Sequence, residues 1–460
     1  MRIAIPLIGQ SYEHRSEDLS AQALKNWYPE YNKEAQAVIS LQPFAGFRPF
    51  ADFSGNSSGA FVLNEKLYAV FDRRLWRIDE AGEKTFIGFI EGEGLISSIA
   101  SGFEAVIVRE GFVYRLDAQT EALTLADDAD FESPTFVAYL NSQAIYNGSE
   151  NRFTVSNAGN LTEINGLNYA TAESNGDPLV RPEVFSDTLY LFGTRTIEPW
   201  YNSGVGNPPF DKIQGSVIQR GLLAPHSVSS NQFAIYFLGD DNAVYRLSGS
   251  QLSTPLTTIP ISQSIAGSKN RFKAVGQCLD YDGQHFYILS IPDERTWVYC
   301  EESASWFELT LGYNQNPFVV NSAISVYGKN YISFDSGLYE VTPEYFNQLI
   351  RVRSSSPVSA GLLGSQNEGL LLQYQSLEII AKIIPRADTN PTLSLDYSDD
   401  NGRTWSPPRD LQIGRLGNYT YRFKGRQLGS AYERVFRVSY SDESFCSIQN
   451  AVAEVEIGIP

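Results

Sequence analysis

The sequence predicts an all-β protein: a β-propeller of six or seven blades, with an irregular N-terminal arm before it and a C-terminal β-sandwich after it. The first observation is composition, because the 460 residues include 26 Tyr and 27 Phe but one Met, and aromatic residues favour pleated, half-buried strands. The second is a repeat of about 40–50 residues in which two alternating strands flank a turn, the spacing of propeller blades. Equivalent positions of this repeat are Leu67, Ala105, Ala144, Leu189, Ile235, Phe286 and Tyr331. Two stacked sandwiches are the alternative architecture.

Four regions follow one another along the chain. Residues 1–52 contain prolines at positions 6, 29, 43 and 49, which indicates an irregular arm with one short helix over residues 16–27, for which Ser16 could be the N-cap. Residues 53–346 contain the strand pairs of the propeller, such as KLYAVF with RLWRID. The Ser- and Gly-rich stretch 347–369 is expected to be a connector. Residues 370–460 supply the strands of a compact sandwich.

The charge argues against a protein whose surface grips nucleic-acid phosphates. The chain has 53 acidic and 35 basic residues, for a formal net charge of −18. Proteins that grip nucleic-acid phosphates present a basic surface. Simple solubility explains the acidic balance equally well, and DNA could still pass along such a surface without specific binding.

The cysteines and the N-terminus indicate where the chain is made. Cys278, Cys300 and Cys446 lack metal-ligand spacing, and an odd number leaves at least one free thiol, which suits a reducing cytoplasm. The first residues do not have the pattern of a signal peptide, and no run of about 18 apolar residues predicts a membrane span.

Sequence motifs for chemistry are missing. There is no phosphate-binding G-x-x-x-x-G-K-[ST], no G-x-S-x-G, no H-E-x-x-H and no paired C-x-x-C. His14, His226 and His285 lie far apart in sequence, so a histidine-based metal site or triad is not expected. His285 starts a strand and is expected to be an ordinary hydrogen-bonded imidazole. We therefore predict no catalytic residue, no metal site and no cofactor.

Glycoside hydrolysis would need two carboxylates flanking a sugar. The doublets Asp240-Asp241 and Glu301-Glu302 do not form such a pair by themselves, because neighbours in a strand point to opposite faces. A sialidase-like site would also need three arginines on one carboxylate, and the candidates are Arg181, Arg195, Arg220 and Arg271. Four tryptophans, Trp76, Trp200, Trp297 and Trp306, are expected to pack between blades, with anchoring of a protein interface as the alternative.

The octapeptide SDDNGRTW fits the S-x-D-x-G-x-T-W pattern known as an Asp box, which is familiar from sialidases. Its residues are Ser398, Asp400, Gly402, Thr404 and Trp405. Asp400 can accept hydrogen bonds from its own turn, and Gly402 can adopt positive φ, so the pattern predicts a structural hairpin turn. The octapeptide lies outside the repeats, whereas a sialidase would normally place several such boxes on its blades.

Three other stretches occur in a fixed order along the chain. They are AQALKNWYPEYN, the segment from Thr194 to Asn231, and the segment from Tyr281 to Leu309. Their distinctive residues are Gln22, Asn26, Tyr28, Pro29, Glu30, Glu198, Trp200, Tyr201, Asn202, Pro209, Phe210, Gly221, Ser227, His285, Trp297 and Trp306. Together they resemble one family, the packaged-DNA stabilisation proteins of short-tailed bacteriophages, also called tail accessory or nozzle proteins. The chain departs from the family pattern at Ala45, which interrupts a Pro-Gly turn, and at Cys300, where an acidic residue is usual.

The resemblance implies a structural component of the virion tail, assembled in the host bacterial cytoplasm. Six copies would form a ring below the portal and its adaptor, extend the DNA channel, and help retain the packaged genome until ejection. Expected partners are other copies of the chain, the tail adaptor or head-completion protein, and fibres, spikes or a needle. Genomic DNA would pass without specific binding, and no membrane partner is expected in the assembled virion.

Two expectations about function stay open at this point. The first is that the arm reaches the adaptor or a neighbouring copy, so that deleting residues 1–50 leaves a folded monomer. The second is an alternative class, a glycan-binding or glycoside-hydrolysing propeller on the virion surface. A cellular scaffold propeller is a third class, which the phage-like motifs disfavour.

Overall fold

The computed structural model describes residues 1–7, 12–13, 21–31, 39–126, 130–172, 176–312, 314–346, 349–359, 362, 369–384, 391–415 and 420–458. Almost all regular structure in these residues is β-strand; the helices are α1 (Ile259–Gly267) and the short 3₁₀ turns η1 (Pro225–Ser227) and η2 (Arg271–Lys273). The prediction of an all-β protein with a propeller and a C-terminal sandwich is confirmed. None of the described helices is long and apolar enough to cross a membrane.

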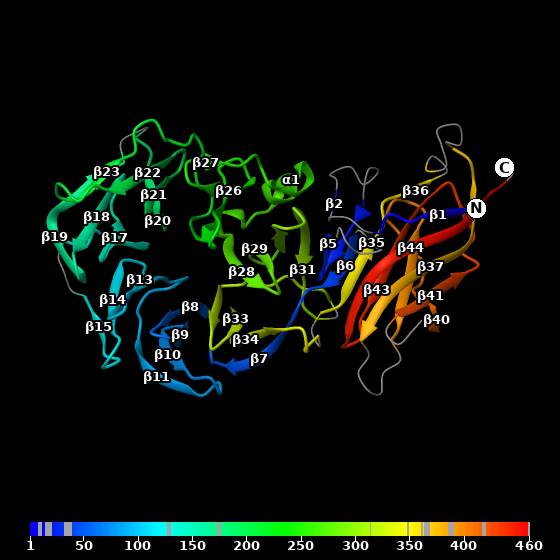
Figure 1. Ribbon diagram of the computed structural model, residues 1–460, viewed down its shortest axis with the longest axis horizontal. Coiled ribbons are helices and arrows are strands. Elements are labelled where there is room, and N and C mark those ends of the chain that lie inside the picture. Colours follow the sequence, from blue (N-terminus) through cyan, green and yellow to red (C-terminus); the bar gives the residue numbers. More distant parts are fainter. Residues whose placement is uncertain are drawn as a thin grey trace.

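The described residues form a ring of seven four-stranded antiparallel units (Figure 1). Of the six or seven blades that the sequence predicts, the propeller therefore has seven. From the innermost strand outward, the blades are β8 (Ser57–Leu63), β9 (Lys66–Phe71), β10 (Arg74–Ile78), β11 (Lys84–Phe89); β12 (Ser97–Ala100), β13 (Glu104–Arg109), β14 (Phe112–Asp117), β15 (Leu123–Leu125); β16 (Val137–Leu140), β17 (Gln143–Asn147), β18 (Arg152–Asn157), β19 (Asn160–Thr171); β20 (Leu179–Phe185), β21 (Thr188–Gly193), β22 (Ile197–Asn202), β23 (Phe210–Lys212); β24 (Ser229–Ser230), β25 (Ile235–Leu238), β26 (Val244–Ser248), β27 (Gln251–Leu252); β28 (Val275–Tyr281), β29 (Gln284–Ile291), β30 (Arg295–Cys300), β31 (Ser305–Leu309); and β32 (Ser322–Val326), β33 (Lys329–Phe334), β34 (Gly337–Thr342) with β7 (Gly46–Asp52). The seven equivalent positions named from the repeat all lie in the second strand of a blade.

Local turn chemistry explains why these strands pair in sequence order. Five blades join their first two strands through two consecutive residues at positive φ, the geometry of the tight hairpin turn that matches strand twist. These pairs are Asn64-Glu65, Asn141-Ser142, Ser186-Asp187, Asp282-Gly283 and Tyr327-Gly328. The innermost strands of successive blades then contact one another around the axis, for example β8 with β12 and β32 with β8. Each blade thereby buries faces that it could not bury alone.

The last blade is completed by the N-terminal part of the chain. Strand β7 pairs antiparallel with β34, in a register that places Asp52 opposite Gly337 and Gly46 opposite Thr342. A strand from one end of the propeller sequence thus closes the ring at the other end. The prediction that residues up to 52 form an irregular arm is wrong for this segment, because β7 is a full member of a blade.

The C-terminal sandwich packs two sheets that also contain N-terminal strands. One sheet has the order β40-β41-β37-β44-β6-β5, with β1 on β44 and β42 on β37; the other continues from blade six as β31-β4-β35-β43-β38-β39, with β36 on β43. Their bounds are β1 (Arg2–Ala4), β4 (Leu24–Lys25), β5 (Trp27–Tyr31), β6 (Ile39–Pro43), β35 (Arg351–Ser354), β36 (Val358–Ser359), β37 (Leu372–Ile384), β38 (Leu393–Ser398), β39 (Arg409–Asp410), β40 (Gln412–Arg415), β41 (Thr420–Arg426), β42 (Ser430–Ala431), β43 (Glu433–Tyr440) and β44 (Phe445–Ile457); β2 (Tyr12–Glu13) and β3 (Ala21–Gln22) pair with each other. One sheet therefore runs without a break from propeller to sandwich.

The helix predicted over residues 16–27 is also wrong where the structure describes it. Residues 21–22, 24–25 and 27 are strand residues, while Ser16 lies outside the described residues. Leu24 and Trp27 are fully buried between elements from distant parts of the chain. Asn26 between them has a φ of 57°, which interrupts any helix. Tertiary pairing overrides the helical pattern, since intrinsic propensity is a weak preference.

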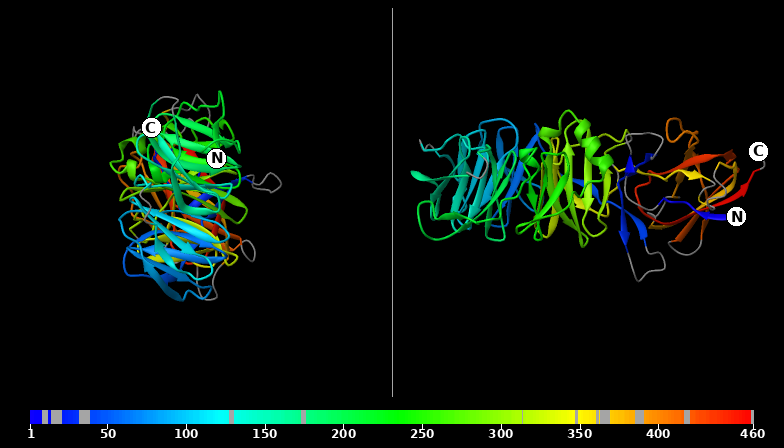
Figure 2. Two further views of the ribbon diagram at one scale, coloured as in Figure 1. Left: turned by 90° about the vertical axis from the view of Figure 1, so that its left-hand side faces the viewer. Right: turned by 90° about the horizontal axis from the view of Figure 1, so that it is seen from above.

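Asn26 and Trp27 fasten the propeller to the sandwich. Asn26 is fully buried; its amide Nδ2 donates to the Ile350 carbonyl at 2.8 Å and to the Thr310 carbonyl at 3.1 Å, and its Oδ1 accepts from the Thr310 backbone N–H at 3.0 Å. Trp27 donates its indole N–H to the Cys446 carbonyl in β44 at 2.9 Å. Figures 1 and 2 show the result, an elongated molecule in which β1, β5 and β6 lie at the sandwich end. A single apolar core spans the junction.

A buried arginine, Arg353, provides further hydrogen bonds at this junction. Arg353 in β35 is 1% exposed and donates to the backbone carbonyls of Leu7 and Ala23. Burial lowers the pKa of Arg353 to about 9, so it stays charged at neutral pH. These hydrogen bonds tie the N-terminal segment to β35, and the Ala23 carbonyl also accepts from the Ser354 backbone N–H at 2.9 Å.

We expect the three thiols to be unreactive in the folded protein. Burial raises the pKa of Cys278 to about 12, of Cys300 to about 11 and of Cys446 to about 12. Because the thiolate is the nucleophile, less than about one part in a hundred of each thiol is reactive at pH 8. Titration with Ellman's reagent should show no rapid release from native protein and three equivalents in denaturant. Fast release of even one equivalent from the native protein would show that a thiol is accessible and ionised.

Candidate functional site

The first family-like motif lies at the junction between the domains. Gln22 belongs to β3, and its side chain is outside the described set. Tyr28 packs edge-on against Phe286 of blade six, with ring centroids 5.3 Å apart. Pro29 pairs with Leu41 in the β5–β6 hairpin, and Glu30 accepts a hydrogen bond from Gln42 at 2.8 Å. Together with Asn26, these residues occupy structural positions at the contact between propeller and sandwich.

The second motif builds the fourth blade. Glu198 is buried, accepts a hydrogen bond from the indole of Trp200 at 3.3 Å and pairs with Lys212 at 3.4 Å. Trp200 packs edge-on against Phe153 of the preceding blade, with ring centroids 5.3 Å apart. Tyr201 is exposed, Phe210 is buried, Asn202 accepts from the Gly204 backbone N–H, and the Pro209 carbonyl accepts from the Ser203 backbone N–H. These contacts fix the blade and the turn beyond it.

Gly221, in the same motif, allows a close approach of two backbone segments. A Cβ atom at this position would lie 2.0 Å from the Thr194 carbonyl oxygen. We expect Gly221→Ala to destabilise the protein by about 1–3 kcal/mol, the usual cost of overpacking a fixed backbone contact. Urea denaturation would measure this, with Gly267→Ala as the matched control because no atom lies within 4 Å of its Cβ position. Equal midpoints for both variants would contradict the account.

The third motif builds the sixth blade. Trp306 is fully buried and donates to the Leu256 carbonyl at 2.9 Å, and Trp297 is buried in the same core cluster. His285 hydrogen-bonds through Nδ1 to Glu302, and although burial lowers its pKa, the contact with Glu302 raises it overall. Trp76, in blade one, is half-buried and packs edge-on against Phe86. Trp200, Trp297 and Trp306 therefore pack within the propeller.

The candidate hydrolytic groups are divided among separate contacts, apart from Asp240 and Asp241, which share Arg220. Glu301 interacts with Tyr236 and Arg246, whereas Glu302 bonds to His285. Arg220 pairs with Asp240 at 2.9 Å and with Asp241 at 3.1 Å. Arg181 pairs with Glu183, and Arg271 donates to the Ser268 carbonyl. Within the part of the chain that the structure describes, no group of three His, Cys, Asp or Glu residues could hold a metal ion.

The SDDNGRTW loop closes the β38–β39 hairpin through its own hydrogen bonds. The Thr404 backbone N–H and hydroxyl donate to Asp400 at 2.8 and 2.6 Å, and the Ser398 hydroxyl donates to Asp400 at 2.6 Å. Hydrogen bonds from Ser398 and Thr404 lower the pKa of Asp400 to about 2. Gly402 has a φ of 93°, and the Trp405 ring lies 3.8 Å from the Arg437 guanidinium. The Asp400 carboxylate is thus engaged with its own turn.

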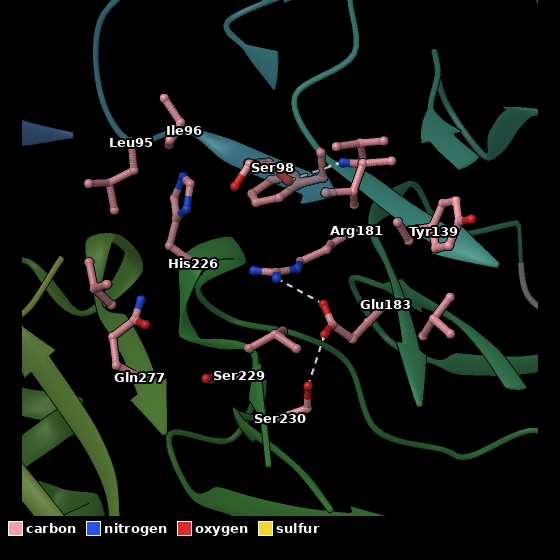
Figure 3. Close-up of a pocket in the computed structure, with 18 of the residues that line it drawn as sticks. Leu95, Ile96, Ser98, Tyr139, Arg181, Glu183, His226, Ser229, Ser230 and Gln277 are labelled. Carbon is pink, nitrogen blue, oxygen red and sulfur yellow. Dashed lines mark hydrogen bonds and ion pairs between the residues drawn. The ribbon is translucent and has the colours of Figure 1, made fainter. Parts of the chain in front are cut away.

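A polar cavity of about 380 Å³ lies on the propeller axis. Its walls come from the innermost strands of several blades and from the loops that precede them (Figure 3). Arg181 donates to the Pro225 carbonyl at 3.2 Å and to Glu183 at 2.8 Å, and Glu183 also accepts from Ser230 at 3.4 Å. His226 faces the same space, and burial, with a further contribution from the charge of Arg181, lowers its pKa to about 4. A cavity of this size is large enough for a small ligand.

The sequence analysis identified one of the polar residues that line this cavity as a candidate and did not link the others to it. Arg181 was among the candidate arginines, but Ser98, His226 and Gln277 had no pattern that linked them to it. Each comes from a different blade or the loop before it, so only ring closure brings them together. The period of the repeat could have indicated that innermost-strand residues face a common axis, but not which polar residues converge there.

The class that this fold defines is an all-β protein in which a propeller and a sandwich form one continuous unit. A family model described as "Bacteriophage P22 Gp10, beta-propeller" matches residues 1–335, and a second, "Bacteriophage P22 Gp10, beta-sandwich", matches residues 359–456. The chain therefore belongs to the bacteriophage P22 Gp10 family of phage DNA-stabilisation proteins, and this confirms the resemblance found in the three motifs. The family is one of phage structural tail proteins.

The other comparisons gave distant similarities. No match was found among curated proteins. Among solved structures, the Neurospora crassa Pan2 WD40 domain is 10% identical, with 65% of this chain and 95% of that chain covered and a TM-score of 0.43. A computationally designed protein, Ika8, is 8% identical, with 64% and 99% covered and a TM-score of 0.41. U3-55K is 13% identical, with 64% and 98% covered and a TM-score of 0.42. At these TM-scores they carry no argument about this chain.

Proposed function

We propose that this chain is a subunit of the phage tail nozzle or hub, a ring that extends the DNA channel below the portal and adaptor. Six copies form the ring, and it helps retain the packaged genome until ejection. The chain acts as a structural part rather than an enzyme. Family membership supports the structural tail role, and the ring, its copy number and its place in the channel are the further steps of this proposal.

The observation that carries the proposal is the continuity of the two domains. A tail segment has to transmit force between the capsid and the parts below it without bending at a linker. Here β31 of blade six pairs with β4, β4 pairs with β35, and β35 pairs with β43 of the sandwich. Hydrogen-bonded strands and a shared apolar core cross the junction, so relative motion of the domains would break both.

The proposed partners follow from this role. Copies of the chain contact one another laterally, the tail adaptor or head-completion protein binds above, and fibres, spikes or a needle bind below. Genomic DNA passes through the ring without specific binding, and the net charge of −18 limits cationic contacts that would hold it. Assembly takes place in the host bacterial cytoplasm.

The test is to produce phage particles that lack this chain. We expect heads that lose their DNA and carry no complete tail, and we expect purified protein added in vitro to restore DNA retention. The Gly267→Ala variant, which adds a Cβ atom to open space, is the control that should restore retention as well as the wild type. Full, tailed particles that merely fail to bind or degrade the host surface would refute the nozzle role and favour the glycan alternative.

A further inference from the structure

Two polar side chains face the axial cavity without a hydrogen-bond partner among the described residues. They are Ser98, in the innermost strand of the second blade, and His226, in the η1 turn before the fifth blade. Figure 3 shows the Ser98 hydroxyl and the imidazole of His226 directed toward the space that the Arg181 guanidinium enters from the opposite side. Three hydrogen-bonding groups from three parts of the ring therefore converge on one volume.

The guanidinium of Arg181 has capacity left for a ligand. An arginine carries five N–H donors, and the described contacts of this one are with the Pro225 carbonyl, at 3.2 Å, and with Glu183, at 2.8 Å. The Arg181 guanidinium also lies 5.0 Å from the ring centroid of Phe136, which holds its position. Planar N–H donors in this arrangement suit the two oxygens of a carboxylate.

The surroundings of His226 in the cavity disfavour its protonated, charged form. Burial, and then the positive charge of Arg181, lower its pKa to about 4, so the ring is neutral at pH 7. The other titratable groups that line the cavity are Glu183, which is held by Arg181 and Ser230, and Tyr139. A negative charge within hydrogen-bond reach of Arg181 and His226 would favour the protonated form of the imidazole.

The imidazole is held in place before any ligand arrives. Ser227, next to His226, is fully buried; its hydroxyl donates to the Ala224 carbonyl at 2.7 Å, and its carbonyl accepts from the Tyr287 hydroxyl at 2.7 Å. The His226 ring packs against Phe136, with ring centroids 4.9 Å apart. A ligand that binds here does not have to order the side chain, which reduces the cost of binding.

We propose that the axial cavity binds a small monocarboxylate, held by Arg181, by a protonated His226 and by the Ser98 hydroxyl. The charge balance selects one negative charge, because Glu183 offsets one of the two cations and leaves a single positive charge to be matched. At about 380 Å³ the cavity has room for the volume of roughly a dozen waters. Binding is coupled to protonation of His226, and the proton is taken up as the pH falls toward the raised pKa of the complex.

The test uses the wild-type protein and pyruvate as the probe, since pyruvate stays ionised down to low pH. The chain contains three histidines, so their ring signals can be followed separately by NMR. With pyruvate at constant ionic strength, we expect the pKa of His226 to rise by more than about one unit. We also expect the affinity to increase as the pH falls from 7 toward 5. The His285 ring, which is bonded to Glu302, should keep its pKa and is the internal control.

Variants then test the assigned groups. Arg181→Met should weaken pyruvate binding at least tenfold, whereas Arg195→Met, outside the cavity lining, should leave it unchanged. An unchanged His226 pKa at about 50 mM pyruvate would overturn the proposal, and so would inorganic phosphate that binds more tightly than pyruvate. The proposal does not depend on the nozzle role, because loss of pyruvate binding and loss of genome retention are measured separately.

Discussion

Deletion of residues 1–52 is expected to leave a chain that does not fold cooperatively, rather than a folded propeller that lacks an arm. The deletion removes β7 from the last blade and β1, β5 and β6 from the sandwich. It also removes six large apolar side chains that are at most 1% exposed: Leu7, Leu24, Trp27, Leu41, Phe44 and Phe47. At about 1.5–3 kcal/mol for each buried side chain, the loss is on the order of 10 kcal/mol, comparable with the whole stability of a typical protein.

Circular dichroism during heating and size-exclusion chromatography would measure this effect. The control is a shorter deletion of residues 1–4, which removes only β1 from the edge of β44 and should keep a sharp transition. A deletion of 1–52 that stays monomeric and unfolds in a sharp transition would restore the arm hypothesis. It would also show that the N-terminal strands add little to the core that they join.

The second large effect is expected from Trp27→Ala. The substitution removes a fully buried indole from the core shared by propeller and sandwich, and the resulting cavity should cost about 3–5 kcal/mol. It also leaves the Cys446 carbonyl without the donor that lies 2.9 Å away. An unsatisfied buried acceptor adds about 1–3 kcal/mol to this cost.

Urea denaturation would compare this variant with Trp76→Ala. Trp76 is only half-buried in blade one, so the same change in side chain should cost markedly less. The expected difference between the variants is at least about 2 kcal/mol in the free energy of unfolding. Variants of equal stability would show that Trp27 does not fasten the two domains.

The propeller could be predicted from the sequence because its signals are local. Strand alternation, turn residues and the repeat period all lie within about 50 residues, and the seven equivalent positions fall in seven second strands. The turn around Asp400 was predictable for the same reason, since its hydrogen bonds join residues no more than four apart.

The N-terminal strands could not be predicted because their partners are remote. Arg2 pairs with Glu454, Lys25 with Glu308, and Gly46 with Thr342. Prolines and a helical pattern therefore gave a wrong picture of residues 1–52. The axial cavity could not be predicted for the same reason. Its residues Ser98, Arg181 and His226 follow no common sequence spacing and come together only when the ring closes.

The N-terminal strands join propeller and sandwich, so the two domains should unfold as one cooperative unit. Differential scanning calorimetry of the purified full-length chain tests it most directly. We expect one transition whose calorimetric and van't Hoff enthalpies agree. Two separated transitions, one of which persists when the other domain has unfolded, would contradict it.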